Sequence, residues 1–241
     1  VSMLIVGGEN LIDMIQTGYQ NDNVLFEAVP GGSPYNLAIA AGRQGLSVGY
    51  LTPISRDSNG DKLVQKLVES NVQIYGERST KPTSLAIVSI NESVPSYAFY
   101  REGTAERQIT LNQLLDNLND KTALFHIGSL GLTGGEDAFV WEEFAKMAKD
   151  NGVGISLDPN VRPSLITDAS SYRQRILRLM AITDVLKLSD EDLEWLYEGM
   201  EQREALSKLL SQTSAKVIVL TKGDKGSLME HNGSWHEESS Y

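Results

Sequence analysis

Two adjacent glycines, Gly31 and Gly32, precede an alanine-rich segment that runs to Arg43, which is the pattern of a loop opening into a helix. Backbone N–H groups at a helix N-terminus, free of obstructing side chains, donate well to hydroxyl or phosphate oxygens. Asn36 is expected in the first turn. A turn followed by a tightly packed helix explains the same glycines as well. The spacing differs from G-x-G-x-x-G, so it gives little support to a dinucleotide-binding fold.

Three charged residues, Asp13, Arg101 and Arg162, have side chains suited to oxygen-rich ligands. An ionised aspartate only accepts hydrogen bonds, which suits vicinal hydroxyls, although a lone Asp more often belongs to a turn or a cap. Arginine offers forked donors to a phosphoryl group or another anion, whereas the simpler interpretation is a surface salt bridge. Arg162 stands between Pro159 and Pro163 after an apolar run, which favours a site role.

Two further segments follow apolar runs in the second half of the chain. Ser189 begins Ser-Asp-Glu-Asp, an ordinary N-cap with acidic first-turn residues that end at Asp192. Thr221 begins a turn whose glycines, Gly223 and Gly226, let the backbone approach a phosphate closely. A tight connection after a strand explains these glycines equally well.

Short apolar runs alternate with helical patterns, and this predicts a parallel sheet with crossover helices, an α/β fold of doubly wound type. The predicted strands are 4–7, 47–51, 123–127, 154–157, 185–188 and 217–220. Helical periodicity predicts helices over 133–149, 190–197 and 203–210. The first of these is expected to present one apolar face made of Phe139, Phe144, Met147 and Ala148.

Two stretches, 12–29 and 84–101, alternate polar with apolar or aromatic residues in the period-two pattern of antiparallel strands. Turn residues lie within each, at Asn21-Asp22-Asn23 and at Asn91-Glu92-Ser93. We expect these strands to form a small antiparallel sheet that acts as a lid over the main domain and keeps water from a reactive group.

Composition narrows the class of protein. The 241 residues are 41% hydrophobic and suffice for one α/β domain with a small appendage. The net charge of −11 argues against nucleic acid or an anionic membrane as a partner. The absence of cysteine excludes disulfides and thiolate sites, and a cytoplasmic location is the natural expectation. The histidines show no metal-ligand spacing, and we interpret them as structural or surface residues: His126, His231 and His236.

The order of these motifs resembles the ribokinase (PfkB) family of carbohydrate kinases, fructokinase-like members in particular, over essentially the whole chain. The resemblance implies a ribokinase-like fold: one mostly parallel sheet flanked by helices, with a small antiparallel lid. The segments that carry it are Gly8 to Asp13, the Gly-Gly-x-x-x-Asn of Gly31 to Asn36 with Gly42 and Gly45, Phe99-Tyr100-Arg101, Asp158-Pro159-Asn160-Val161-Arg162-Pro163, Lys187 to Asp192, and Thr221 to Gly226.

The same resemblance implies ATP as co-substrate, Mg²⁺ as metal, and a role for each segment. Arg162 is expected to stabilise charge on the transferred phosphoryl group. Asp192 stands where the family has a glutamate, and it would contact Mg²⁺ through water. Residues implied to bind the sugar are Asp13, Gly31, Gly32, Asn36 and Arg101. Residues implied to bind ATP are Asn160, Lys187, Ser189, Thr221, Gly223 and Gly226.

The family's second signature, D-T-x-G-A-G-D, which contains the aspartate base, is absent from this sequence. We therefore expect that base beyond residue 241, and we expect the single ribokinase-like domain of residues 1–241 to lack its C-terminal part. Fructose is the favoured substrate. The alternatives are 2-keto-3-deoxygluconate, which Arg101 keeps open, a riboside, or sugar binding without catalysis. A homodimer through the lid would cover its exposed edges.

Overall fold

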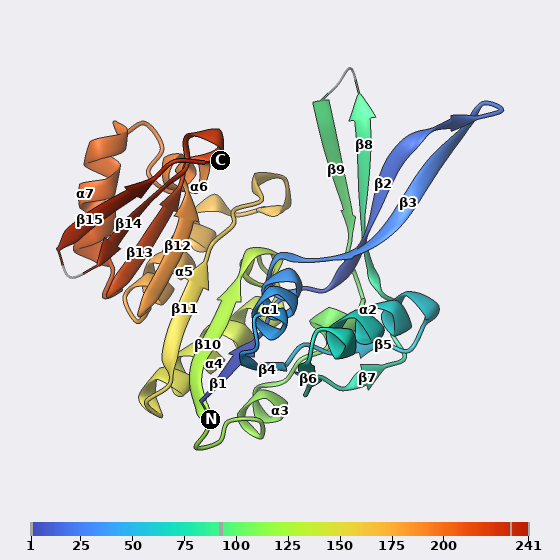
Figure 1. Ribbon diagram of the computed structural model, residues 1–241, viewed down its shortest axis with the longest axis horizontal. Coiled ribbons are helices and arrows are strands. Elements are labelled where there is room, and N and C mark those ends of the chain that lie inside the picture. The colour runs from blue at the N-terminus through green and yellow to red at the C-terminus, as the bar shows by residue number, and fades with distance from the viewer. Residues whose placement is uncertain (1, 92–93, 232, 241) are drawn as a thin grey trace. The chain divides into compact units, whose positions relative to one another are not determined.

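A computed structural model describes residues 2–91, 94–231 and 233–240, and the chain divides into two compact units, Met3–Asn117 and Leu118–Tyr241. Each unit contains parallel strands packed with helices, as the alternating sequence pattern predicts (Figure 1). The fold is α/β and ribokinase-like. No helix in the described part of the chain is long and apolar enough to cross a membrane.

In the first unit, three parallel strands stand in the order β1-β4-β6. Their apolar residues are buried together with those of the first two helices, and this core includes Val6, Tyr35, Val48 and Leu63. The elements are β1 (Met3–Val6), α1 (Ser33–Arg43), β4 (Ser47–Tyr50), β5 (Ile54–Ser55), α2 (Ser58–Glu69), β6 (Val72–Ile74), β7 (Arg78–Ser79) and α3 (Leu111–Leu115).

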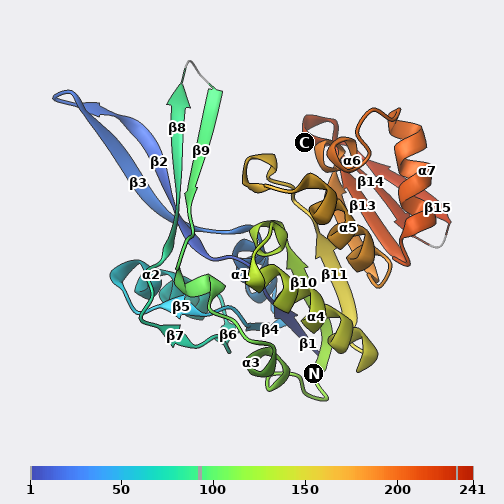
Figure 2. The ribbon, with the colours of Figure 1, turned by 180° about the vertical axis from the view of Figure 1, so that it is seen from behind.

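A separate four-stranded sheet in this unit has the order β3-β2-β8-β9, and its long strands extend away from α1 and α2 (Figures 1 and 2). Asn21 and Asp22 take positive φ values of 48° and 64°, which gives the tight hairpin turn that their types favour. The outer strand pairs are antiparallel, but β2 and β8 pair in parallel. The strands are β2 (Leu11–Gln20), β3 (Asn23–Gly31), β8 (Ser84–Asn91) and β9 (Val94–Tyr100). The second expected turn includes residues 92–93, which lie outside the described residues.

In the second unit, six strands have the order β15-β14-β13-β12-β11-β10, of which β10 to β13 are parallel. A polar antiparallel hairpin, β14 and β15, extends this sheet. Figure 2 shows α4 and α5 on one face of the strands. The elements are β10 (Thr122–Gly128), α4 (Glu136–Asp150), β11 (Gly154–Asp158), α5 (Ala169–Met180), β12 (Val185–Ser189), α6 (Asp190–Leu196), α7 (Gln202–Gln212), β13 (Val217–Thr221), β14 (Ser227–His231) and β15 (Ser234–Glu238).

The apolar face expected on the helix over 133–149 is partly wrong. Phe139 is 59% exposed and Met147 is 36% exposed, whereas Trp141 and Phe144 are buried. The helix begins at Glu136, and its inward face follows Ala138, Trp141, Phe144, Ala145 and Ala148, a regular three-and-four spacing. The guanidinium of Arg175 instead lies over the ring of Phe139, with Arg175 Cζ 4.8 Å from the ring centroid.

Candidate functional site

The turn that joins β3 to α1 is built around Gly31 and Gly32. A Cβ on Gly31 would lie 2.1 Å from Asp13 Oδ2, and a Cβ on Gly32 would lie 2.7 Å from the carbonyl oxygen of Glu9. Gly32 also has a φ of 112°, where glycine is strongly favoured. The helix begins at Ser33, whose N–H donates to Glu9 Oε1 over 2.9 Å. The glycine pair is therefore a packing requirement, and the close approach also keeps side chains away from the helix N-terminus.

Asp13 lies beside this turn, within strand β2, where it pairs with Val29 and Ala86 on the neighbouring strands. It is half-buried, and burial raises the pKa of its carboxyl group above the usual value. Asn36 is exposed in the first turn of α1, and its N–H donates to the carbonyl oxygen of Gly32 over 2.8 Å. The structure thus gathers Asp13, the glycine turn and Asn36 at one place in the first unit.

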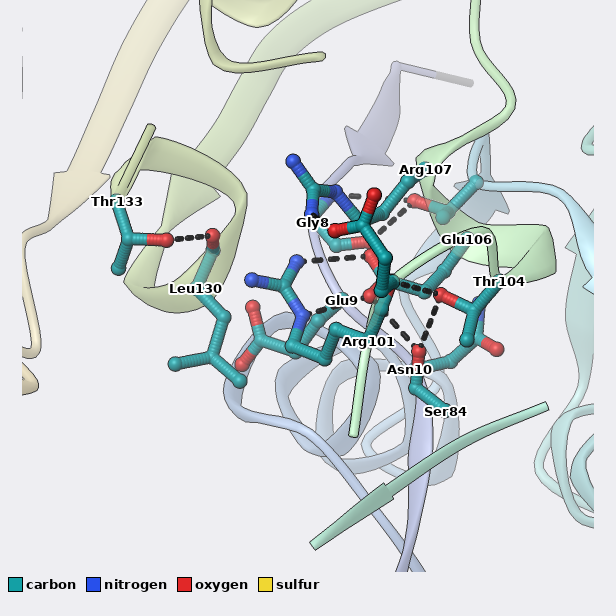
Figure 3. Close-up of polar contacts among 12 residues, drawn as sticks. Gly8, Glu9, Asn10, Ser84, Arg101, Thr104, Glu106, Arg107, Leu130 and Thr133 are labelled. Carbon is teal, nitrogen blue, oxygen red and sulfur yellow. Dashed lines mark hydrogen bonds and ion pairs between the residues drawn. The ribbon is translucent and has the colours of Figure 1, made fainter. Parts of the chain in front are cut away.

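Arg101 follows the last residue of β9 and lies in a buried ion pair. Its Nε and Nη2 donate to Glu106 Oε1 and Oε2 over 2.7 and 3.1 Å (Figure 3). The hydroxyl of Ser84 donates to Glu106 Oε1 over 2.9 Å. Thr104 Oγ1 donates to the carbonyl oxygen of Arg101 over 2.8 Å and lies 2.8 Å from Ser84 Oγ. Sequence reasoning identified the arginine but missed its carboxylate partner.

Glu9 is a second buried carboxylate near this ion pair, and Figure 3 shows it with Arg101 and Glu106. Burial raises the pKa of Glu9, and the charge of Arg101 counteracts this in part. The backbone carbonyl of Glu9 accepts from the hydroxyl of Tyr50 over 3.1 Å. Glu9 belongs to the segment that resembles the family's opening strand, yet its residue type alone gave no sign that it would cap α1.

In the second unit, parallel pairing brings the carboxyl ends of β10 to β13 to one edge of the sheet. Lys187 Nζ lies 3.1 Å from Asp158 Oδ2 across neighbouring strands. Burial raises the pKa of Asp158, and Lys187 opposes the shift. Asp158 Oδ1 is also buried, and it accepts no hydrogen bond within the described chain. Lys187 and Asp158 therefore form a charged pair at an edge where ligands commonly bind.

The loop after β11 holds Asn160 and Arg162 in different surroundings. Asn160 has a φ of 38° and donates to Ser129 Oγ over 3.2 Å, and Ser129 itself has a φ of 55°. Such conformations cost about 1–3 kcal/mol each and often occur at functional sites. Arg162 is exposed, and its Nη1 donates to the carbonyl oxygen of Val161 over 3.0 Å. Among the described residues Arg162 has no ion pair.

Asp192 links this loop to the start of α6. Its Oδ1 accepts from the N–H of Val161 over 2.7 Å, and its Oδ2 accepts from the N–H of Ser189 over 2.8 Å. The N–H of Asp192 in turn donates to Ser189 Oγ, which completes a capping box. The N-cap interpretation is confirmed. Within residues 2–91, 94–231 and 233–240, no group of three or more His, Cys, Asp or Glu side chains is arranged to hold a metal.

A cavity of about 660 Å³ lies against the turn after β13, a volume within the usual range for small-molecule sites. Four of the residues predicted to bind ATP line this cavity. It is also lined by residues that sequence reasoning had not assigned, including Lys222, Lys225, Ser239 and Ser240. Asn160 and Lys187 are not in contact with it. The lining consists of Ser189, Asp190, Glu191, Thr221, Lys222, Gly223, Asp224, Lys225, Gly226, Ser227, Glu238, Ser239 and Ser240.

The turn itself requires its glycines. Gly223 and Gly226 have φ values of 57° and 89°, and a Cβ on Gly226 would lie 1.9 Å from the carbonyl oxygen of Glu238. The N–H of Lys222 donates to the carbonyl oxygen of Gly226 over 2.8 Å, which closes the turn. Lys222 also forms an ion pair with Glu237. Four carboxylates line the same cavity, so the parts of it that suit a phosphate are the glycine turn and its lysines.

The three histidines occupy β10 and the polar hairpin of β14 and β15. His126 is 3% exposed on β10, with Nδ1 2.9 Å from Ser156 Oγ. Burial, with a smaller contribution from Lys187, lowers the pKa of His126 to about 4. His231 and His236 are exposed on the polar hairpin. The interpretation of all three as structural or surface residues agrees with these positions.

Comparison with known proteins gives consistent matches. The family model described as pfkB family carbohydrate kinase matches residues 2–240. A protein named fructokinase from Rhizobium leguminosarum bv. trifolii is 37% identical over 226 residues, covering 93% of this chain and 68% of that protein.

Solved structures show the same similarity. A fructokinase from Xylella fastidiosa superposes with a TM-score of 0.88 at 26% identity, covering 98% of this chain and 78% of that chain. A second structure of that fructokinase, with bound ATP, gives a TM-score of 0.85 at 26% identity over 98% of this chain and 77% of that one.

Proposed function

Because the chain belongs to the pfkB family of carbohydrate kinases, we propose that it transfers the γ-phosphoryl group of Mg-ATP to the 6-hydroxyl group of fructose. The observation that carries the nucleotide part of this proposal is the cavity of about 660 Å³ against the Thr221–Gly226 turn. The fructokinase names of its relatives support the sugar, and the ATP bound by one of those fructokinases supports the nucleotide.

The first unit supplies the sugar-binding residues in this proposal. Asp13 would accept hydrogen bonds from vicinal hydroxyls, since its carboxylate has acceptors alone when ionised. The uncovered N–H groups behind Gly31 and Gly32, and the amide of Asn36, would donate to other sugar oxygens. Arg101 would contribute to the shape and charge of the site from within its ion pair with Glu106.

The second unit supplies the nucleotide-binding residues. The backbone of Thr221, Gly223 and Gly226 would contact the phosphates, and Ser189 would lie at the same cavity. Asn160 and Lys187 would act from the neighbouring strand ends. Arg162 would stabilise charge on the transferred group, because its exposed guanidinium has backbone carbonyls as partners and no carboxylate within the described residues.

In the reaction, the 6-hydroxyl oxygen forms a bond to the γ-phosphorus while the bond from that phosphorus to the β,γ-bridging oxygen breaks, and ADP leaves. The hydroxyl proton passes to a base that the family resemblance places beyond residue 241. Mg²⁺ would enter as part of Mg-ATP, held mainly by phosphate oxygens and water. Both oxygens of Asp192 already accept backbone N–H groups, and we propose that it contacts Mg²⁺ through water.

The test measures ADP release from Mg-ATP by two proteins, the full-length gene product, called here the extended protein, and the 241-residue chain. The acceptors are fructose, ribose, 2-keto-3-deoxygluconate and adenosine. We expect fructose to give the largest increase with the extended protein, and Arg162→Met to remove most of it. Sugar binding without sugar-dependent ADP release by either protein would contradict the proposal.

We also propose a homodimer through the four-stranded sheet. Large apolar side chains are exposed on it: Tyr19, Val24, Leu25, Phe26, Tyr97 and Tyr100. A second copy would cover them and the sheet edges. Light scattering behind size exclusion should give twice the chain mass, and Tyr19→Lys with Tyr97→Lys should halve it; a wild-type mass equal to one chain would contradict the proposal.

A further inference from the structure

The ion pair between Arg101 and Glu106 is almost fully removed from water. Arg101 is 7% exposed and Glu106 is 2% exposed, and two hydrogen bonds join the guanidinium to both carboxylate oxygens. Ser84 fixes the carboxylate from a second direction. Bidentate pairs of this kind hold the guanidinium in one orientation and are stronger than neutral hydrogen bonds. The positive charge of Arg101 is therefore already matched.

The described charged residues around this ion pair provide no excess positive charge that could attract a substrate carboxylate. Glu9 adds a second buried carboxylate that feels the charge of Arg101. Arg107, the next cation along the chain, is 23% exposed and lies 3.8 Å from Glu102, which is fully exposed. An incoming carboxylate would have to compete with Glu106 for Arg101, or remain desolvated beside two carboxylates. Both are costly because Arg101 and Glu106 are buried.

A direct structural connection runs from the ion pair to the glycine turn. Glu9, which feels the charge of Arg101, accepts the N–H of Ser33 at the start of α1. Its carbonyl oxygen contacts Gly32 so closely that a Cβ there would lie at 2.7 Å. Ser84, which holds Glu106, pairs with Leu11 on β2, two residues before Asp13. The charged cluster is thus linked to the glycine turn through Glu9 and to β2 through Ser84.

We propose that Glu106 determines substrate specificity: by holding Arg101 in a bidentate ion pair, it withholds this guanidinium from substrate carboxylates, so that the site takes neutral sugars and rejects sugar acids. The inference rests on the proposed function, which assigns Arg101 to the sugar site. A six-carbon sugar acid such as 2-keto-3-deoxygluconate is the rejected class, and fructose is the accepted one.

The test is isothermal titration of the 241-residue chain with fructose and with 2-keto-3-deoxygluconate, because binding does not depend on turnover. Wild type should bind the acid at least about tenfold more weakly than fructose, and Glu106→Gln should reduce this ratio at least about tenfold, the equivalent of one charge-assisted hydrogen bond. Glu102→Gln is the matched control: it removes one carboxylate four residues away at a fully exposed position, and it should leave the ratio unchanged.

A second variant covers the case in which Glu106→Gln does not fold. Arg101→Met with Glu106→Leu replaces the buried pair by apolar side chains, a change that buried ion pairs often tolerate. It should keep the wild-type preference for fructose. Stronger acid binding by this double variant would overturn the inference, and so would an unchanged ratio in a folded Glu106→Gln variant, equal binding of both sugars by wild type, or no binding of either.

The proposed function can fail separately from this inference. If fructose gave no ADP release while Glu106→Gln still gained affinity for the acid, the kinase assignment to fructose would be wrong and the role of Glu106 would stand. If ADP release were normal and the ratio did not move, the reverse would hold.

Discussion

Replacing Asp192 with Ala should strongly lower the stability of the second unit. This carboxylate joins two segments that are 28 or more residues apart in the sequence. It accepts the N–H of Val161, after β11, and the N–H of Ser189, at the start of α6. Asp192 is 4% exposed, so water does not readily replace it. The prediction tests whether the residue acts as a structural cap or mainly as a metal contact.

The magnitude follows from the two bonds. A hydrogen bond to a charged group contributes about 1.5–3 kcal/mol to stability, so losing both should cost about 3–6 kcal/mol. This is a large fraction of the 5–15 kcal/mol typical of a folded domain. Asp192→Asn should fall between wild type and Asp192→Ala, because its amide has a single acceptor oxygen. Glu191→Ala, at an exposed position in the same first turn, loses a helix-dipole interaction of about 0.3–1 kcal/mol.

The assay is urea unfolding followed by tryptophan fluorescence, since all three tryptophans, Trp141, Trp195 and Trp235, belong to the second unit. The midpoint should fall sharply for Asp192→Ala and slightly for Glu191→Ala, without Mg²⁺ in either case. A metal-free Asp192→Ala protein as stable as the Glu191→Ala protein would refute the capping argument. If that same protein had lost Mg²⁺-dependent nucleotide binding, the metal role would be favoured instead.

Two further predictions concern a buried histidine and a glycine. The pKa of His126 is lowered from 6.5 to about 4, mainly by burial, so the unfolded chain binds one proton more between these values, and stability should fall by about 3 kcal/mol as the pH drops from 6.5 to 4. His126→Gln should flatten this pH dependence in urea unfolding, whereas His236→Gln, at an exposed position, should not; equal effects would contradict the assignment. Gly32→Ala should be destabilised by about 2 kcal/mol more than Gly45→Ala, measured by circular dichroism, because a Cβ meets Glu9 at the first site and nothing within 4 Å at the second, although both have positive φ. Similar losses for the two alanine variants would show that backbone strain, and not the contact with Glu9, makes Gly32 necessary.

The parallel strands were predictable because strands buried on both faces appear as continuous apolar runs. The strand at 217–220, for example, is observed as Val217–Thr221. The polar hairpin of β14 and β15 was not predicted, because its second strand is exposed along its whole length and has no alternation of apolar and polar residues. The parallel pairing of β2 with β8 was likewise hidden. Alternation predicts that a strand has two different faces, but it does not reveal the direction of its neighbour.

At the sites, sequence reasoning succeeded where the determining contact is local. The cap formed by Ser189 and Asp192 spans three residues and follows a known spacing. The bond from Asp192 to Val161 spans 31 residues and has no local signal. The same applies to Glu9, whose partner Ser33 lies 24 residues away. Such contacts depend on how the strands are ordered, so the residue types can be identified before their partners can.

Arg101 and Arg162 show most clearly what the fold adds to residue type. Both follow strand-like sequence, and both were expected to offer a fork of donors to an anion. Arg101 is buried against Glu106, so drawing it toward a ligand would leave a carboxylate desolvated and unpaired. Arg162 is exposed and donates to backbone carbonyls of its own loop, which water can satisfy when the side chain moves. We therefore expect different roles for the two arginines. Arg162 can move to stabilise charge as it develops on a phosphoryl group, whereas Arg101, held and neutralised by Glu106, affects which sugar binds.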